Sequence, residues 1–519
     1  MEGEFITLIL ENSRFKVDKG KLITKSRYFQ CLFSHNFNDS QNEEHVINYD
    51  ITSSTLQNFV EWIYDKEDVV VEDSYSIKSS LKKYERDYLS DFLKLLQLSV
   101  LFVVDDLISD ITDIIVLHWL DSEHVIDIWL LAQELGIHIL RDISFAVCLD
   151  RFTDLSINSL IELPINNLKQ LVENVNVRST ERYIHNVVSK WVYHSTDRSK
   201  IDISNLNISK VKKSKFTLYM VGYKTENSGT KTGYIAFWDE GKLSELTELK
   251  DIKSSGKEIV GMQLTGRGFS IYVIGGEYGF GTGQFNTIIW RYCLISKKWY
   301  YFARLPRPRR HMVVAFLSNR LIVVGGVGPR RVKLSSVDAL NIHTGEWESV
   351  ANVPECFTEV PPHCVMKKKL FLLKSSLYIF CPELGSWNTV MLSSISPSLR
   401  RTDSDLEYRV TIFMIHDLEI MGNTGTVSFR ISNTQSGICE ECLKLYKDVS
   451  AEDIIYSLDT LHTVLGPDIG IISIFVKYCK SSDCQVFHLH NKTGIDKQEL
   501  TLVPRIGNCY TIDPKTLYD

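Results

Sequence analysis

A short repeat in the second half of the chain most constrains what the chain can fold into. In its first copy, the apolar residues 271–274 lead into the pair Gly275-Gly276. Tyr292 follows after a variable stretch, and Trp299 stands seven residues beyond it. Four consecutive apolar residues before two glycines predict a buried strand that ends in a tight turn.

The second copy has the same order of features. Residues 321–324 lead into Gly325-Gly326, and Leu340 stands seven residues before Trp347. A unit of this length cannot bury its apolar face alone, so neighbouring units must stack. One glycine pair and one tryptophan in each unit predict the blades of a β-propeller.

Weaker copies flank these two. A third unit, Leu370 to Trp387, has Lys374-Ser375 in place of the glycines but keeps Phe380 seven residues before the tryptophan. Three degenerate units run from Phe216 to about Leu246 with Gly222, from Val410 to about Ile431 with Gly422, and from Ile471 to about Gly494. The length of the chain fits a propeller of six blades, and propellers of five or seven blades are the alternatives.

The glycines and tryptophans of the repeat have structural roles. Glycine tolerates a positive φ and leaves no Cβ in a crowded turn, and no helix start follows these glycines that could bind phosphate. Tyr292 and Trp299 should lie on adjacent strands across a hairpin. Replacing Trp299 or Trp347 by Ala should cost about 3–5 kcal/mol if these side chains are fully buried.

Bulk composition excludes some classes of protein. The net charge of −6 gives no reason to expect nucleic acid or a membrane as partner. The apolar run 92–108 contains Lys94 and Asp105-Asp106, which argues against a membrane span. Residues 1–4 do not resemble a signal peptide, so we expect a cytoplasmic protein, with the nucleus as the alternative location. The eleven cysteines should then be free thiols.

The first hundred residues alternate short strands and helices. Residues 5–17 predict a β-hairpin, residues 22–33 a short helix and residues 46–49 a strand. Residues 56–64 carry apolar side chains at the spacing of a buried helical stripe. This is the pattern of a small α+β domain.

These residues resemble a BTB (POZ) domain. The spaced pattern that carries the resemblance consists of Phe15, Val17, Lys19, Leu22, Ser26, Tyr28, Phe29, Leu32, Phe33 and the run 59–64. Asp18 stands where this family usually has His, and Lys21 where it usually has an apolar residue. Residues 69–84 look like a polar insertion.

The stretch from Leu89 to about His194 has helical periodicity. Residues 125–152 and 181–191 resemble the BACK domain, with Leu163-Pro164 at its break between helices. A polar linker is expected over residues 194–214, where the period changes from 3.6 to 2. Together with the propeller units, which resemble kelch repeats, these resemblances imply a multidomain fold: an α+β BTB domain over 1–120, an all-α BACK domain over 121–200, and an all-β kelch propeller over 215–519.

BTB, BACK and kelch repeats in this order are similar to the BTB-kelch (kelch-like) family. The resemblance implies a non-catalytic substrate adaptor of a cullin-3 ubiquitin ligase, in which BTB and BACK bind cullin-3 and the propeller binds the protein substrate. The family's hydrophobic-x-Glu contact to cullin corresponds to Phe37-Asn38-Asp39, with Asp in place of Glu. The chain starts four residues before Phe5, without the helix and strand that usually reinforce the family's homodimer, so we expect weakened dimerisation.

Basic residues gather around the two clearest units. Arg309, Arg310 and His311 precede one strand pair, and Arg330, Arg331 and Lys333 follow its glycines. Propeller loops converge at the ends of the central channel, and arginines bind carboxylates and phosphates through paired hydrogen bonds. The sequence predicts a substrate site for an acidic or phosphorylated segment, and an ordinary solvated surface is the alternative.

No catalytic motif accompanies the repeats: a Gly-x-Ser-x-Gly elbow, a His-Glu-x-x-His pair and a phosphate loop are all missing from the sequence. Cys439 and Cys442, with Cys479 and Cys484, could supply four thiolates to zinc, but their spacing favours free thiols. We therefore expect no metal and no cofactor. A scaffold that binds actin-type filaments without cullin is the alternative function, and a propeller enzyme is a third.

Overall fold

The structure is a computed structural model that divides into two compact units, residues 1–148 and 149–519. It describes residues 4–34, 42–65, 68–71, 75–84, 87–174, 177, 179, 181–194, 218–225, 231–239, 242–249, 259–267, 269–361, 363–366 and 369–390, and beyond residue 390 the strands given below. The expected linker falls almost entirely outside this set. Within the described residues, no helix is both long and apolar enough to cross a membrane.

The first unit begins with a three-stranded sheet. β1 (Phe5–Leu10) pairs antiparallel with β2 (Ser13–Asp18) and parallel with β3 (Glu44–Val46). Every second side chain of β1 is buried, namely Ile6, Leu8 and Leu10. This alternation is that of a sheet with one face on the core, and it confirms the predicted hairpin.

The predicted helix over 22–33 is wrong as a single element. It consists of α1 (Lys19–Lys25) and α2 (Arg27–Leu32), which are separated by Ser26 in an extended conformation. The Ser26 hydroxyl accepts a hydrogen bond from the Phe29 amide at 3.2 Å and donates one to the Phe102 carbonyl at 2.6 Å. A serine that caps a new helix therefore breaks the old one.

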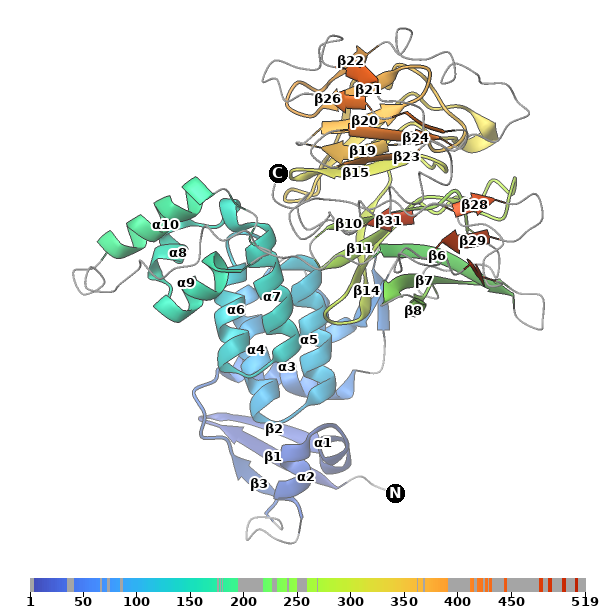
Figure 1. Cartoon of the computed structure of the whole chain (residues 1–519). Helices are drawn as coiled ribbons and strands as arrows, with labels where there is room; N and C mark the ends of the chain where they lie inside the picture. Colours follow the sequence, from blue (N-terminus) through green and yellow to red (C-terminus); the bar gives the residue numbers. More distant parts are fainter. Residues whose placement is uncertain are drawn as a thin grey trace. The chain divides into compact units, whose positions relative to one another are not determined.

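Five α-helices follow the sheet in the part of the first unit that the structure describes. They are α3 (Ser53–Tyr64), α4 (Leu89–Leu101), α5 (Asp105–His118), α6 (Val125–Glu134) and α7 (His138–Asp150), which reaches the start of the second unit. Figure 1 shows α3, α4 and α5 packed side by side. Phe102 joins them to α2, since its ring lies 4.9 Å from that of Phe29 and 5.1 Å from that of Phe59, centroid to centroid.

The expected polar insertion contains regular structure. β4 (Asp68–Val71) and β5 (Tyr75–Lys78) form a hairpin, and the short 3₁₀ helix η2 (Ser79–Tyr84) follows it. Leu81 and Tyr84 are each 1% exposed. The end of this segment therefore belongs to the core of the unit.

The second unit starts with short helical elements: η3 (Phe152–Asp154), α8 (Ile157–Glu162), α9 (Ile165–Val172) and α10 (Glu181–Tyr193). Pro164 occupies the N-cap position of α9 and separates this helix from α8, as the Leu163-Pro164 pair predicts. The Trp191 indole donates a hydrogen bond to the Leu163 carbonyl at 2.8 Å, which ties α10 to this break.

Antiparallel sheets follow in the described part of the second unit, and four of the sheets there have four strands. The first sheet contains β6 (Leu218–Thr225), β7 (Lys231–Asp239) and β8 (Lys242–Glu248), with β31 (Cys509–Thr511) beside β6. The second contains β10 (Gln263–Arg267), β11 (Ser270–Ile274), β13 (Ile288–Cys293) and β14 (Lys298–Arg304). Two short strands pair separately: β9 (Ile259–Val260), which precedes β10 in the sequence, and β12 (Glu277–Tyr278), which lies between β11 and β13.

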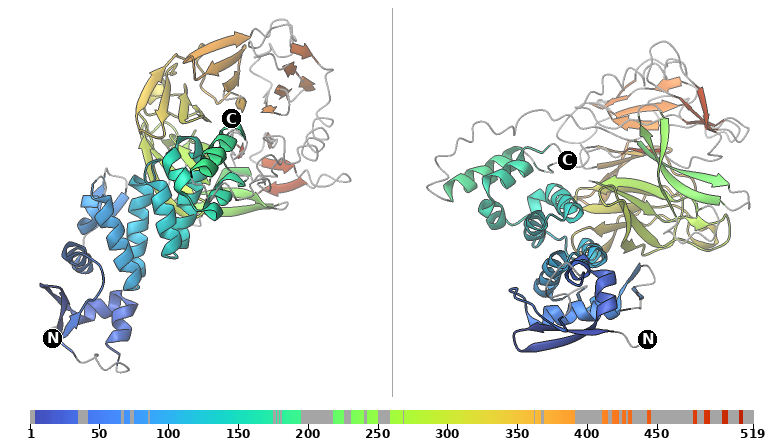
Figure 2. Two further views of the ribbon diagram at one scale, coloured as in Figure 1. Left: turned by 90° about the vertical axis from the view of Figure 1, so that its left-hand side faces the viewer. Right: turned by 90° about the horizontal axis from the view of Figure 1, so that it is seen from below.

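The third and fourth sheets follow the same order. They are β15 (Val313–Leu317), β16 (Arg320–Val324), β17 (Val337–Asn341) and β18 (Trp347–Val350), then β19 (His363–Met366), β20 (Lys369–Leu373), β21 (Leu377–Cys381) and β22 (Ser386–Val390). Smaller sheets contain β23 (Thr411–Met414), β24 (Leu418–Gly422) and β25 (Gly425–Val427); β26 (Phe429–Ile431) and β27 (Leu443–Leu445); and β28 (Val476–Tyr478), β29 (Cys484–Phe487) and β30 (Lys497–Leu500). Figure 2 shows the second, third and fourth sheets following one another around a curve.

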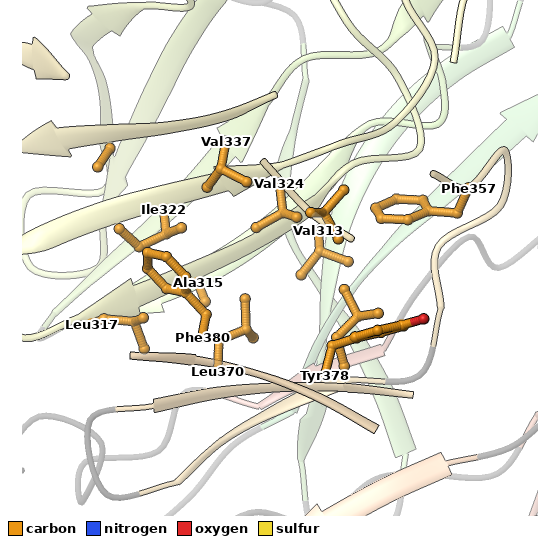
Figure 3. Close-up of a cluster of buried hydrophobic side chains, with 13 residues drawn as sticks. Val313, Ala315, Leu317, Ile322, Val324, Val337, Phe357, Leu370, Tyr378 and Phe380 are labelled. Atoms are coloured by element: carbon orange, nitrogen blue, oxygen red, sulfur yellow. The ribbon is translucent and has the colours of Figure 1, made fainter. Parts of the chain in front are cut away.

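The third sheet buries both of its faces. Val313 and Ala315 on one face pack with Leu370 and Phe380 of the fourth sheet (Figure 3). Residues of its other face, such as Val314, pack in a cluster with side chains of the second sheet. This two-sided burial explains why β15 is apolar at every position instead of alternating.

The aromatic pairs lie where the spacing predicts. Tyr292 is directly opposite Trp299 in the sheet, with ring centroids 5.1 Å apart, and Phe380 is opposite Trp387 at the same separation. Trp299, however, is only partly buried, as is Trp347. The condition of full burial is not met, so the cost of truncating either side chain falls below the range for a buried tryptophan.

Candidate functional site

The glycine pairs shape the loops in which the predicted site residues lie. Gly325 and Gly326 have φ of 56° and 92°. A Cβ added to Gly326 would lie 2.6 Å from the Arg310 carbonyl oxygen. Only glycine fits this turn, and the close approach brings the segment 309–311 against the loop that follows β16.

Arg309 lies inside the second unit, not on its surface. Its side chain is fully buried, and one terminal nitrogen donates to the Gly325 and Ser336 carbonyls, each at 3.2 Å. The other terminal nitrogen forms an ion pair with Asp338 of β17. Burial lowers the pKa of Arg309, and Asp338 opposes that effect. Arg309 therefore fixes the turn between the sheets and is not available to a ligand.

Arg310 is buried in a different environment. Its Nε lies 3.3 Å from Oε2 of Glu277, whose other oxygen accepts a hydrogen bond from the Gly283 amide at 2.7 Å. Both side chains are less than a tenth exposed. The Arg310 Nη1 atom is buried and has no hydrogen-bond partner in the described part of the chain. The guanidinium carbon lies 4.6 Å from the ring centroid of Phe280.

Arg330, Arg331 and Lys333 are exposed on the loop between β16 and β17. Among the residues that the structure describes, none of the three forms an ion pair. Arg330 and Arg331 both adopt left-handed backbone conformations, with φ of 56° and 60°. For residues other than glycine this strain costs about 1–3 kcal/mol each and occurs most often at functional sites.

His311 is partly buried and contacts the preceding segment. Its amide donates to the Gly261 carbonyl at 2.8 Å, and a Cβ added to Gly261 would lie 2.9 Å from the imidazole ring. Burial lowers the pKa of His311, and the positive charge of Arg310 lowers it further. The imidazole is therefore neutral at physiological pH and adds no charge to the site.

The structure thus separates the six predicted substrate-site residues. It brings Arg310 and Arg331 to the same ring, that of Phe280, with the Arg331 guanidinium carbon 5.6 Å from its centroid. Phe280 and Glu277 were not predicted from the sequence. A signal was present, since Phe280 lies between Gly279 and Gly281 in a glycine-rich loop after the first glycine pair.

The predicted cullin contact, Phe37-Asn38-Asp39, lies outside the described residues, between α2 and β3. Cys439, Cys442 and Cys479 lie outside them as well, and Cys484 falls within β29. The cysteines whose side chains are described are free thiols, namely Cys31, Cys148, Cys293, Cys356 and Cys381. In that part of the chain, no group of three or more His, Cys, Asp or Glu side chains is placed to hold a metal ion.

Two protein-family models match the chain. One is the BTB/POZ domain, over residues 6–100, and the other is the kelch motif, over residues 308–354. The kelch match contains β15 to β18 together with Arg309, Arg310 and both predicted loops. No curated protein matches the chain. The chain therefore combines a BTB/POZ domain with a kelch motif, the pairing that characterises the BTB-kelch family.

Proposed function

We propose that the protein is a non-catalytic adaptor that recruits a protein substrate to a cullin-3 ubiquitin ligase. The observation that carries the proposal is the presence of a BTB/POZ domain and a kelch motif in one chain. BTB domains commonly dimerise and bind cullin-3, kelch domains bind substrates, and such modules are generally adaptors or scaffolds. In this protein the BTB and BACK domains would hold the ligase, and the kelch propeller would hold the substrate.

The proposal assigns three domains to the chain: BTB over 1–120, BACK over 121–200 and a kelch propeller over 215–519. The helices α6 to α10 are compatible with a BACK domain. Six blades follow if β23 to β27 form one blade and β28 to β30 another, beside the four complete sheets. The pairing of β31 with β6 supports a closed ring, because a strand late in the sequence completes the first sheet.

Cullin-3 binding would involve Phe37, Asn38 and Asp39. The test is a binding titration of the full-length protein with the amino-terminal region of cullin-3. We expect association, and a loss of about tenfold or more in affinity for Phe37→Ala, because an aromatic anchor commonly carries a large share of binding energy. Tyr88→Ala is the matched control, since Tyr88 is an exposed aromatic residue of the same unit, at 65% exposure.

The outcomes separate two functions. No detectable association with cullin-3 would overturn the adaptor and leave the filament-binding scaffold. Equal losses for Phe37→Ala and Tyr88→Ala would refute the assignment of the contact to Phe37-Asn38-Asp39. Size-exclusion chromatography with light scattering on the same samples shows whether the protein dimerises.

A further inference from the structure

Two loops from different sheets meet on the surface of the second unit. The loop between β12 and β13 carries Phe280, and the loop between β16 and β17 carries Arg331. Besides the contact of Arg331 with the Phe280 ring, a Cβ added to Gly281 would lie 4.0 Å from Nη2 of Arg331. We call the shared surface the Phe280 patch; it consists of the exposed residues Phe280, Arg330, Arg331, Val332 and Lys333. The buried Arg310 contacts the Phe280 ring and supports the patch.

The aromatic ring of the patch, that of Phe280, is exposed to solvent, and one of its faces contacts a buried arginine. Phe280 is 65% exposed, an unusual state for a phenylalanine. Its ring rests on the buried guanidinium of Arg310, which Glu277 holds in place. Val332, at 54% exposure, extends the apolar surface. Aromatic side chains and arginines are enriched at protein interfaces relative to the rest of a protein surface.

The exposed charge of the patch is positive. Glu277, the acidic side chain that pairs with the supporting Arg310, is 4% exposed. Arg330, Arg331 and Lys333 are exposed and form no ion pair with any residue that the structure describes. A ligand that complements this surface must therefore carry negative charge.

Backbone hydrogen bonds close the loop that carries Arg330 and Arg331. The Gly328 amide donates to the Val332 carbonyl at 2.9 Å, and the Val332 amide donates to the Pro329 carbonyl at 3.2 Å. The left-handed residues Arg330 and Arg331 lie inside this hydrogen-bonded turn. A loop that is already ordered loses little conformational entropy when a ligand binds.

We propose that the Phe280 patch binds an acidic peptide segment of the substrate. Its carboxylates contact Arg330, Arg331 and Lys333, and an apolar side chain between them packs on Phe280 and Val332. This inference rests on the proposed function, in which the second unit captures a protein. Nucleic acid fits less well, because binding it takes many phosphate contacts and the chain has a net charge of −6.

The test is a fluorescence anisotropy titration of the full-length protein. The probe is a labelled peptide of sequence Glu-Glu-Leu-Glu-Glu, compared with Glu-Glu-Ser-Glu-Glu and Lys-Lys-Leu-Lys-Lys. We expect the first to bind, the serine peptide to bind more weakly, and the lysine peptide not to bind. Raising the salt concentration should weaken binding, because the exposed charges are screened.

Variants locate the site. Arg331→Glu should weaken binding of the acidic leucine peptide about tenfold, because it replaces an attraction with a repulsion. Phe280→Ala should reduce the preference for leucine over serine, and Lys333→Glu provides a second charge reversal on the same loop. Lys297→Glu is the matched control, since Lys297 is exposed in the turn at the opposite end of the second sheet.

Three results would overturn the inference: no binding of the acidic leucine peptide, binding that Arg331→Glu and Lys333→Glu leave unchanged, or equal losses for Lys297→Glu and Arg331→Glu. Cullin-3 binding by the same samples distinguishes the two proposals. If cullin-3 binds and the peptide does not, the inference fails and the adaptor stands. If the peptide binds and cullin-3 does not, the adaptor fails and the patch stands.

Discussion

The buried pair of Arg309 and Asp338 gives the sharpest test of how the second unit is held together. Their side chains are 0% and 3% exposed, respectively. Removing one member of such a pair leaves a buried charge without its partner, which costs about 3–5 kcal/mol. We therefore expect Arg309→Met and Asp338→Leu each to destabilise the unit by about that amount.

The double variant should cost far less than the sum of the two single changes. Replacing both charges by apolar side chains removes the unpaired charge, and the main remaining loss is the hydrogen bonds that Arg309 gives to the Gly325 and Ser336 carbonyls. That loss is about 1–3 kcal/mol, so the coupling between the two positions should be at least about 3 kcal/mol. Arg307→Met is the control, because Arg307 approaches the same Asp338 at 3.9 Å but is 46% exposed, and its loss should cost less than about 1 kcal/mol.

The assay must report on this unit alone, because a chain of several domains need not unfold in one step. Hydrogen exchange of peptides from β16 and β17, measured by mass spectrometry, gives the local opening free energy of the two strands. Single-variant losses that simply add in the double variant would refute the buried-pair account. A loss for Arg307→Met as large as that for Arg309→Met would refute the role of burial.

Two further predictions concern the same unit. Gly326→Ala should destabilise it by about 1–3 kcal/mol or more, because the new methyl group would meet the Arg310 carbonyl in a left-handed conformation. Gly345→Ala should cost less, because nothing lies within 4 Å of its new Cβ. Hydrogen exchange of peptides from β16 and β17 compares the two variants, and equal losses would exclude the close approach. For Glu355, burial raises the pKa, but hydrogen bonds from Lys374, Ser375 and Tyr378 outweigh it and lower the pKa to about 2. A carboxyl group whose pKa is lower in the folded state than its ordinary value of 4.5 stabilises the fold above pH 4.5, and this contribution should be lost as the pH falls from 4.5 towards 2. Thermal melts over that pH range should show a shallower fall in melting temperature for Glu355→Gln than for the unchanged protein. Identical slopes would contradict the assignment.

The sequence predicts the strands of the second and third sheets well because their signals are local. A glycine pair, an aromatic or apolar residue and a tryptophan seven residues later are enough to place three strands and their pairing. The fourth sheet keeps the aromatic pair without the glycines. Lys374 stands where the first glycine would be, and it forms an ion pair with Glu355 at 2.8 Å that no local pattern specifies.

The substrate-site prediction depends on tertiary contacts and is therefore less reliable. A run of basic residues indicates a solvated surface, yet Arg309 is buried because Asp338 lies on a strand 29 residues later in the sequence. Phe280 resembles an ordinary loop residue until Arg310 and Arg331 are seen against its ring. The break between α1 and α2 has a local signal in the sequence, since serine, here Ser26, is a favoured residue at the start of a helix.

The pairing of β31 with β6 has a consequence for synthesis on the ribosome. Nearly three hundred residues separate the two strands, so β6 to β8 emerge long before the strand that completes their sheet. Until residues 509–511 emerge, β6 has an unpaired edge that is free to bind another chain. A nascent or truncated chain that ends before residue 509 should therefore depend on chaperones more strongly than the finished protein.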